Sequence, residues 1–442
     1  MKKNIVSLII KMSLPPALSM VIQSLYNLID SIYITNYDEL AMEAISIVYP
    51  IQNIILAIAV GIGVGINAFA SLRLGENNFN SAKNVATTGT LIAIFNYFVV
   101  LVIGLLVAPI FIKNFTNNPL VIDYSLTYIN LIIIFSFTTI IQIALEKILQ
   151  ADKKMLLPMI SLLVGTITNV ILDPILIFNC NLGILGAAIA TVIAQVLATL
   201  VMIFFVFSKY NKLKLNIRNY NFAFDDLKNI YKIAIPAFFI NAVPSLMVAL
   251  MNLILVDLSS SAITTFGIYY KLQYFVYMGV CGISQGTMPL MSFSYGAKDY
   301  KKLKSLINHS TLLSAIIGLF CTVIFLIIPQ LLMAIFYKDE ILIKNSATFL
   351  RLASLGFMFG CFNYILASYF QSIQKSVTSL IICLLRQLII LLPFAYFLSN
   401  YQNENGVYLA ITLTEIITSI ITFIIYKYSN KKLSNHEQLV LQ

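Results

Sequence analysis

Two acidic residues lie inside stretches of the sequence that are otherwise apolar. Asp30 lies in one such stretch, and Asn169 and Asp173 lie four residues apart in another, so these two share one face of a helix. A third stretch carries Ala187 and Thr191, again four apart. Two carboxylates, an amide oxygen, a hydroxyl and the Ala187 carbonyl are oxygen ligands suited to a hard cation such as sodium.

The expected depth of these residues supports a common site. Counted from the outer ends of their helices, Asp30, Asp173 and Thr191 all lie about 8–10 Å below the outer surface, at about 1.5 Å per residue. Two neighbouring carboxylates cannot easily both stay ionised unless a cation or a proton neutralises them, which is the chemistry of a coupling-ion site. The alternative interpretation is that the two acids cap kinked helices or lie near a wet interface.

The elements that must position these residues are membrane-spanning helices. The 442 residues are 60% hydrophobic and only 10% charged. Apolar runs of about 20 residues, the length that crosses a bilayer, recur along the whole chain. We predict an all-α polytopic membrane protein with twelve transmembrane helices, at 8–35, 43–72, 84–112, 120–148, 156–179, 184–208, 230–256, 262–294, 303–336, 346–371, 376–399 and 406–428. The basic start resembles a signal peptide, but it lacks a cleavage site and belongs to a repeat, so we expect it to be retained.

The sequence is duplicated, and the two copies align when the chain is shifted by half its length. Pro15 then falls on Pro236, Gly61 on Gly282 and Gly65 on Gly286. Six spans per half predict two six-helix lobes related by a pseudo-two-fold axis along the membrane normal. The expected domains are a lobe at 1–208 that holds the cation site, a cytoplasmic loop at 209–229, a lobe at 230–428 and a polar cytoplasmic tail at 429–442.

The duplication does not extend to the acidic residues. Asp30 falls on Met251, and Asp173 falls on Phe394. The cation site is therefore expected in the first lobe alone. Clustered glycines in the second span of each half predict either close helix packing or a hinge.

The chain has a net charge of +10, and the distribution of its positive residues indicates the membrane topology. With the N-terminus inside, 22 of the 28 Lys and Arg residues fall on inner segments and three on outer loops. This bias predicts both termini in the cytoplasm of a bacterium, with the chain in the cytoplasmic (inner) membrane. We accordingly expect the anionic lipids of the membrane as its partner, and no nucleic acid.

Other polar residues inside the spans could line a substrate cavity or bond neighbouring helices. The candidates for the cavity are Asn27, Gln52, Asn67, Gln142, Asn252, Lys271 and Arg386. Lys271 and Arg386, together with Glu415, fall near the middle of their spans and could instead pair as an internal structural network.

Enzyme signatures are missing from the sequence. We find no Walker phosphate loop, no His-Glu-x-x-His and no Gly-x-Ser-x-Gly elbow. We therefore expect no enzyme and no cofactor, and transport driven by an ion gradient.

At this point the chain resembles a known family, the multidrug and toxic compound extrusion (MATE) transporters, in their bacterial multidrug branch. The resemblance covers about residues 8 to 428. It rests on Pro15 through Asp30, Gly61 through Gly75, Asn169 with Asp173, Ala187 with Thr191, Gly286-Thr287-Met288-Pro289, Tyr295-Gly296-Ala297-Lys298, Phe370-Gln371-Ser372 and Leu385-Arg386-Gln387.

The resemblance implies two six-helix lobes around a central cleft, with sodium or proton binding in the first lobe driving substrate release. It assigns the ion site to Asp30, Asn169, Asp173 and Thr191, with the Ala187 carbonyl, and a bend of the first helix to Pro15. Some members also use acids in the seventh and tenth helices, a pattern that this sequence does not match.

These observations predict a secondary active exporter that extrudes amphipathic, cationic compounds by sodium or proton antiport and functions as a monomer. A flippase of lipid-linked oligosaccharides or cell-wall precursors, from the same superfamily, is the alternative within transport. A membrane-embedded enzyme or sensor is the alternative outside it.

Overall fold

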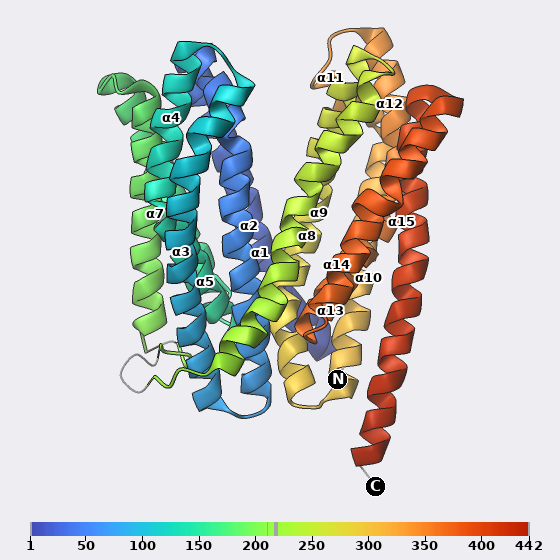
Figure 1. The fold of residues 1–442 in the computed structure, drawn as a ribbon. Helices are drawn as coiled ribbons and strands as arrows, with labels where there is room; N and C mark the ends of the chain where they lie inside the picture. Colours follow the sequence, from blue (N-terminus) through green and yellow to red (C-terminus); the bar gives the residue numbers. More distant parts are fainter. Residues whose placement is uncertain (1, 210, 216–219, 441–442) are drawn as a thin grey trace. The chain divides into compact units, whose positions relative to one another are not determined.

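The computed structural model describes the backbone of residues 2–209, 211–215 and 220–440. Side chains are described in the same ranges apart from residues 2–4, 27, 28, 31, 39, 260, 261 and 432–440. Within this part of the chain every regular element is a helix (Figure 1). The predicted all-α class is confirmed.

Two compact units make up the structure. The first-half unit comprises Leu18–Ala242, and the second-half unit comprises Val243–Gln442 together with Met1–Ala17, as far as these are described. The helices that lie in or enter the first-half unit are α1 (Lys2–Tyr37), α2 (Glu39–Gly75), α3 (Phe79–Phe115), α4 (Pro119–Ile134), α5 (Ser136–Ala151), α6 (Leu156–Pro174), the π-helix η1 (Ile175–Asn179), α7 (Gly183–Phe207) and α8 (Phe224–Val256).

The second-half unit contains the end of α8, the start of α1 and the remaining helices. These are α9 (Ser260–Gly296), α10 (Tyr300–Ile327), α11 (Pro329–Ala334), α12 (Glu340–Ser354), α13 (Phe357–Ser372), α14 (Ser376–Leu384), the π-helix η2 (Leu385–Ile389) and α15 (Leu391–Val440).

The twelve predicted spans can each be located in the described chain. Eight helical segments are long and apolar enough to cross a membrane, and two bent pairs, α4 with α5 and α12 with α13, raise the number to ten. One of the eight, Ser376–Lys431, holds two predicted spans, because Gln402 and Asn403 interrupt it with non-helical backbone. The remaining predicted span, 262–294, lies within α9, a helix of 37 residues.

The structure adds breaks that hydropathy did not indicate. The predicted span 120–148 bends by 44° between α4 and α5, and 346–371 bends by 44° between α12 and α13. The predicted span 303–336 ends its main helix at Ile327 and continues as the short α11. Hydropathy cannot detect such bends, because apolar residues lie on both sides of each break.

The duplication is repeated in the backbone. Asn77 and Lys298, at equivalent positions, both adopt a positive φ, of 59° and 55°. The residue after each begins the next helix: Asn78 accepts from the Ser81 N–H, and Asp299 accepts from the Lys302 N–H. Helices α3 and α10 therefore begin with equivalent turns, and in each a side chain caps a free N–H group of the first helical turn.

The two units are not divided where the sequence suggested. The expected lobes were 1–208 and 230–428, whereas α1 passes from one unit to the other after Ala17 and α8 after Ala242. In addition, α8 begins at Phe224, inside the expected loop 209–229, and α15 extends to Val440, through most of the expected tail. Helix α1 is continuous through Pro15 and Pro16, so the change of unit directly follows these prolines.

Close backbone approach explains the clustered glycines. A Cβ on Gly61 would lie 2.8 Å from the Ala234 carbonyl oxygen, and one on Gly65 would lie 2.7 Å from that of Ile230, both on α8. In the second-half unit, a Cβ on Gly286 would lie 2.5 Å from the Met12 carbonyl oxygen on α1. The second span of each half therefore packs directly against the backbone of a long helix that changes unit, as small residues allow.

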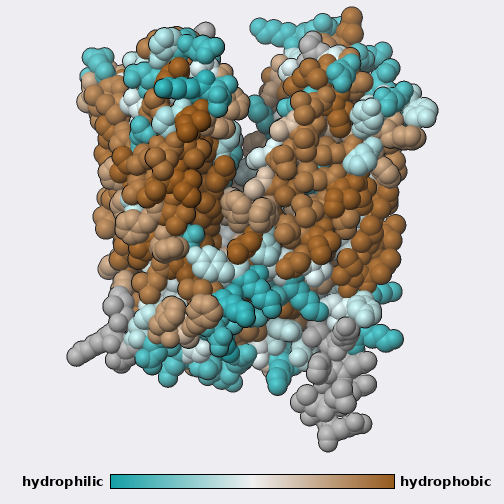
Figure 2. All heavy atoms as spheres, viewed as in Figure 1, coloured by the Kyte–Doolittle hydropathy of each residue, from teal (hydrophilic) through white to brown (hydrophobic). Residues whose placement is uncertain are grey.

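The surface of each unit fits a bilayer. On the face shown in Figure 2, hydrophobic residues cover the middle of the helices and hydrophilic residues gather at their ends. Large apolar side chains along α3 and α10 are exposed, including Leu106 at 67% and Phe320 at 64%. Such surface suits contact with lipid, and the chain is a multi-pass membrane protein.

Candidate functional site

The predicted acidic pair meets inside the first-half unit. Asp30, on α1, and Asp173, at the end of α6, have carboxyl groups that lie close to each other. Asp173 is 0% exposed. Two carboxyl groups this close cannot easily both stay ionised unless a proton or a cation neutralises them.

Asn169 and Thr191 complete the group. The Asn169 Nδ2 donates to Asp173 Oδ1 at 3.2 Å and to Thr191 Oγ1 at 3.5 Å. Both residues are buried, as is Ala187, one turn before Thr191 on α7. The structure therefore brings together Asp30, Asn169, Asp173 and Thr191 from three helices.

Three oxygen atoms at this site are buried without a hydrogen-bond partner. They are Asp30 Oδ1, Asn169 Oδ1 and Asp173 Oδ2. Buried acceptors are normally paired, and an unpaired one is costly. Three such acceptors, two of them from carboxyl groups, fit a hard cation, which binds through oxygen ligands. None of the three ion pairs between described residues includes Asp30 or Asp173.

Local backbone features hold the site together. Directly after Asp173, Pro174 ends α6, and the chain continues as the π-helix η1. A π-turn at this point is consistent with proline, which cannot donate to the preceding turn. Helix α7 packs tightly on η1, because a Cβ on Gly186 would lie 2.6 Å from the Leu176 carbonyl oxygen. This contact fixes α7, and with it Thr191, beside α6.

Two tyrosines belong to the site and were not predicted. The hydroxyl groups of Tyr26 and Tyr128 both lie close to the Thr191 side chain and to the two acids. The Tyr128 hydroxyl also accepts from Gln52 Nε2 at 3.3 Å. Tyr26 could have been found, since it precedes Asp30 by four residues and shares its helix face. No sequence signal distinguishes Tyr128.

The predicted cavity residues do not form one group. Gln52 borders the acidic site through Tyr128, whereas the Asn67 Nδ2 donates to Gln150 Oε1 at 3.5 Å. Gln142 and Asn252 are half-buried, and Lys271 is exposed. The side chain of Asn27 lies outside the described residues. Arg386, which is half-buried, belongs to a second charged group.

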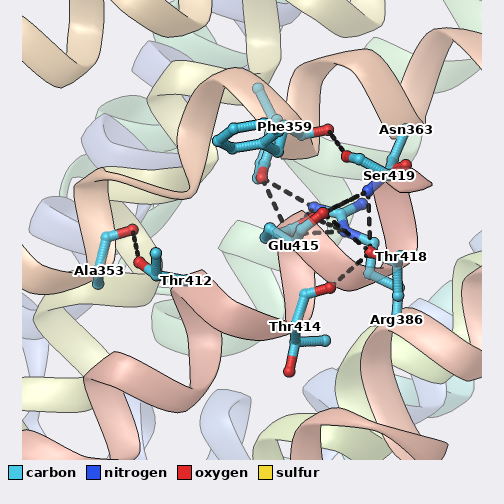
Figure 3. Close-up of polar contacts among 10 residues, drawn as sticks. Ala353, Phe359, Asn363, Arg386, Thr412, Thr414, Glu415, Thr418 and Ser419 are labelled. Carbon is cyan, nitrogen blue, oxygen red and sulfur yellow. Dashed lines mark hydrogen bonds and ion pairs between the residues drawn. The ribbon is translucent and has the colours of Figure 1, made fainter.

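Figure 3 shows this second group, in the second-half unit. Arg386 Nε donates to both Glu415 carboxylate oxygens, at 2.7 and 2.8 Å, and Nη2 donates to the Tyr277 hydroxyl at 2.8 Å. Asn363 Nδ2 donates to Glu415 Oε2 at 3.3 Å. The internal network that the sequence left open therefore forms between Arg386 and Glu415, and Lys271 is not part of it.

A third polar group lies at the end of α5. Lys147 Nζ donates to Glu146 Oε1 and to Gln150 Oε1, each at 3.0 Å, and Gln150 Nε2 donates to Glu146 Oε1 at 2.7 Å. Just beyond the helix, the Lys212 N–H donates to Asp152 Oδ2 at 3.1 Å, while burial raises the pKa of the Asp152 carboxyl. The bond between Lys212 and Asp152 holds the end of α5 to the segment that follows α7.

No group of three or more His, Cys, Asp or Glu side chains that could hold a metal is found among the described residues. The acidic site has two carboxyl groups and takes its other oxygens from Asn169 and Thr191. Its donors are thus those of an alkali cation rather than a transition metal.

Comparisons with known proteins place the whole chain. A family model described as MatE matches residues 15–175 and again residues 236–397, so the second match begins at Pro236, the duplicate of Pro15. Multidrug export protein MepA of Staphylococcus haemolyticus is 24% identical over 429 residues, covering 95% of this chain and 93% of that protein. MepA of Staphylococcus aureus (strain MRSA252) is 22% identical over 414 residues, covering 93% and 91%.

Solved structures share the fold. A crystal structure of MATE in complex with MaL6 has a TM-score of 0.93 at 20% identity and covers 98% of this chain and 97% of its own. The same values hold for the outward-facing conformation of a multidrug resistance MATE family transporter of the MOP superfamily. The predicted fold class is therefore confirmed.

Proposed function

This chain belongs to the MatE family, and on that premise we propose that it is a secondary active multidrug exporter. It extrudes amphipathic, cationic compounds across the cytoplasmic membrane of a bacterium in exchange for sodium ions or protons. The names of its relatives, multidrug export proteins over more than nine-tenths of the chain, support the export of drugs. The inward bias of Lys and Arg supports cytoplasmic termini.

The buried, unpartnered oxygens of Asp30, Asn169 and Asp173 carry the proposal for ion coupling. A sodium ion or a proton bound there neutralises the two carboxyl groups and joins α1, α6 and α7 through their side chains. A cationic substrate competes for the same negative charge, so binding of one partner weakens binding of the other, and this coupling is reciprocal.

The flippase alternative is less well supported. A flippase of lipid-linked precursors needs a cationic cavity to hold pyrophosphate, and the sequence offered Lys271 and Arg386 for it. Arg386 is paired with Glu415, and Lys271 is exposed. We further propose that the protein works as a monomer among anionic lipids.

Dye efflux from proteoliposomes, driven separately by a sodium gradient and by a pH gradient, tests the function. We expect one gradient to drive efflux in the wild type, and Asp30→Asn and Asp173→Asn to abolish it while the protein still inserts. Asp123→Asn, which changes an exposed carboxylate of α4, is the matched control and should export normally. Undiminished efflux in Asp173→Asn would exclude the coupling site, and no movement under either gradient in the wild type would favour an enzyme or a sensor.

A further inference from the structure

Both units contain buried carboxyl groups, and among the described residues Glu415 of the second-half unit has a built-in counter-charge. Glu415 lies near the middle of the last span, and its side chain is 7% exposed. The Arg386 guanidinium contacts both of its oxygens, and Arg386 Nη2 lies 2.7 Å from Oε1. Asp30 and Asp173 in the first-half unit have no such ion pair among the described residues.

The duplication shows that this ion pair is specific to the second-half unit. When the two copies are aligned, Arg386 corresponds to Gly165 and Glu415 corresponds to Ala194. These two positions also face each other in the first-half unit, because a Cβ on Gly165 would lie 3.3 Å from the Ala194 carbonyl oxygen. The same helix contact is therefore made by two small residues in one unit and by a charged pair in the other.

We propose that Arg386 is a fixed counter-cation that performs for Glu415 the task that the exchangeable cation performs for Asp30 and Asp173. This inference rests on the proposed cation coupling. As a consequence Glu415 needs no exchangeable cation, and of these two buried acidic sites only that of Asp30 and Asp173 exchanges one. Removing the guanidinium would leave a buried carboxylate with neutral donors but no counter-charge, and it must then acquire a proton or a free cation.

The surroundings of Glu415 leave it no other source of positive charge among the described residues. The titratable groups that act on it from neighbouring helices are the hydroxyls of Tyr269 and Tyr277 on α9 and the Cys361 thiol on α13. Asn363 supplies a neutral donor. The Arg386 side chain is 15% exposed, so its removal opens a route by which water and a small cation can reach Glu415.

Thermal unfolding of purified protein tests this inference without relying on transport. The background variant has Asn at both 30 and 173, so that the first-half site is silent. When Arg386→Met is added to this background, the Tm should rise by about 2–4 °C when NaCl replaces choline chloride or when the pH falls from 8 to 6. Adding Glu415→Gln as well should remove this dependence.

A Tm of the background with Arg386→Met that responds to neither sodium nor pH would overturn the proposal. Should this variant not be recovered, the same comparison is made by yield: Arg386→Met with Glu415→Gln must be recovered better than Arg386→Met alone. Equal losses would show that charge balance is not the role of Arg386. The proposed coupling site is tested separately, by comparing how the Tm of the wild type and that of the background variant depend on sodium and pH. Failure of one proposal is therefore distinguishable from failure of the other.

Discussion

At the scale of single residues, the acidic site depends on hydroxyl groups as much as on carboxylates. Thr191 Oγ1 accepts from the Asn169 amide at 3.5 Å, and the hydroxyl groups of Tyr26 and Tyr128 lie close to it. These tyrosines close the site with groups that carry no charge at neutral pH, and they link α4 to α1 and α7. The tyrosines therefore position the oxygens that the cation needs.

Removing one hydroxyl from this network should weaken cation binding without abolishing it. We expect Tyr128→Phe to raise the sodium or proton concentration for half-maximal efflux by about five-fold, the effect of one hydrogen bond of about 1 kcal/mol. Tyr97→Phe is the control, because the Tyr97 hydroxyl donates at the exposed surface to the Ile134 carbonyl oxygen, at 3.0 Å. If both variants shift the half-maximal concentration equally, Tyr128 has no particular role at the site.

At the scale of helices, the position of Thr191 depends on how α7 meets η1. Gly186 lies against the Leu176 carbonyl oxygen, so no side chain fits between the two helices. The backbone carbonyl cannot rotate away from an added methyl group as a side chain could. The contact that holds the helix is thus a backbone contact five residues before the site residue.

Gly186→Ala should therefore both destabilise the protein, by about 1–3 kcal/mol, and weaken ion coupling. Gly267→Ala offers a matched control, because a Cβ there meets nothing within 4 Å, and alanine favours a helix interior over glycine by about 1 kcal/mol. The measurement is thermal unfolding of both variants together with gradient-driven efflux. A stable, fully coupled Gly186→Ala would show that α7 can move without displacing Thr191.

At the scale of the whole molecule, neither half of the chain contains a complete unit. Residues up to Ala17 belong to the second-half unit, and residues up to Ala242 belong to the first-half unit. The glycines that receive these exchanged segments, Gly65 and Gly286, approach their backbones closely. Each unit therefore needs a segment that is encoded in the other half.

Expressing the chain as two fragments, with residues 216–219 between the halves omitted, should test this exchange. Expressed alone, the fragments 1–215 and 220–442 should each be degraded, because each lacks a helix that covers its glycines. Expressed together they should form a stable complex with measurable efflux. Recovery of either fragment alone, resistant to protease in the membrane, would contradict the exchange.

The sequence by itself determined much of this protein. The apolar runs predicted the twelve spans, since hydropathy is a local property, and the alignment of the two halves predicted the repeat that the turns at Asn77 and Lys298 now display. It also selected Asp30, Asn169, Asp173 and Thr191, because an ionisable or polar residue is conspicuous in an apolar span.

Only the tertiary structure decided which groups meet. Tyrosine is common in apolar spans, so nothing in the sequence marked Tyr128 as a neighbour of Thr191. The sequence placed Lys271, Arg386 and Glu415 near the middle of their spans, but it did not show that Arg386 pairs with Glu415 while Lys271 is exposed. The bends within spans and the exchange of helix ends were hidden for the same reason. Contacts between helices far apart in the sequence depend on how their surfaces pack, which no local pattern records.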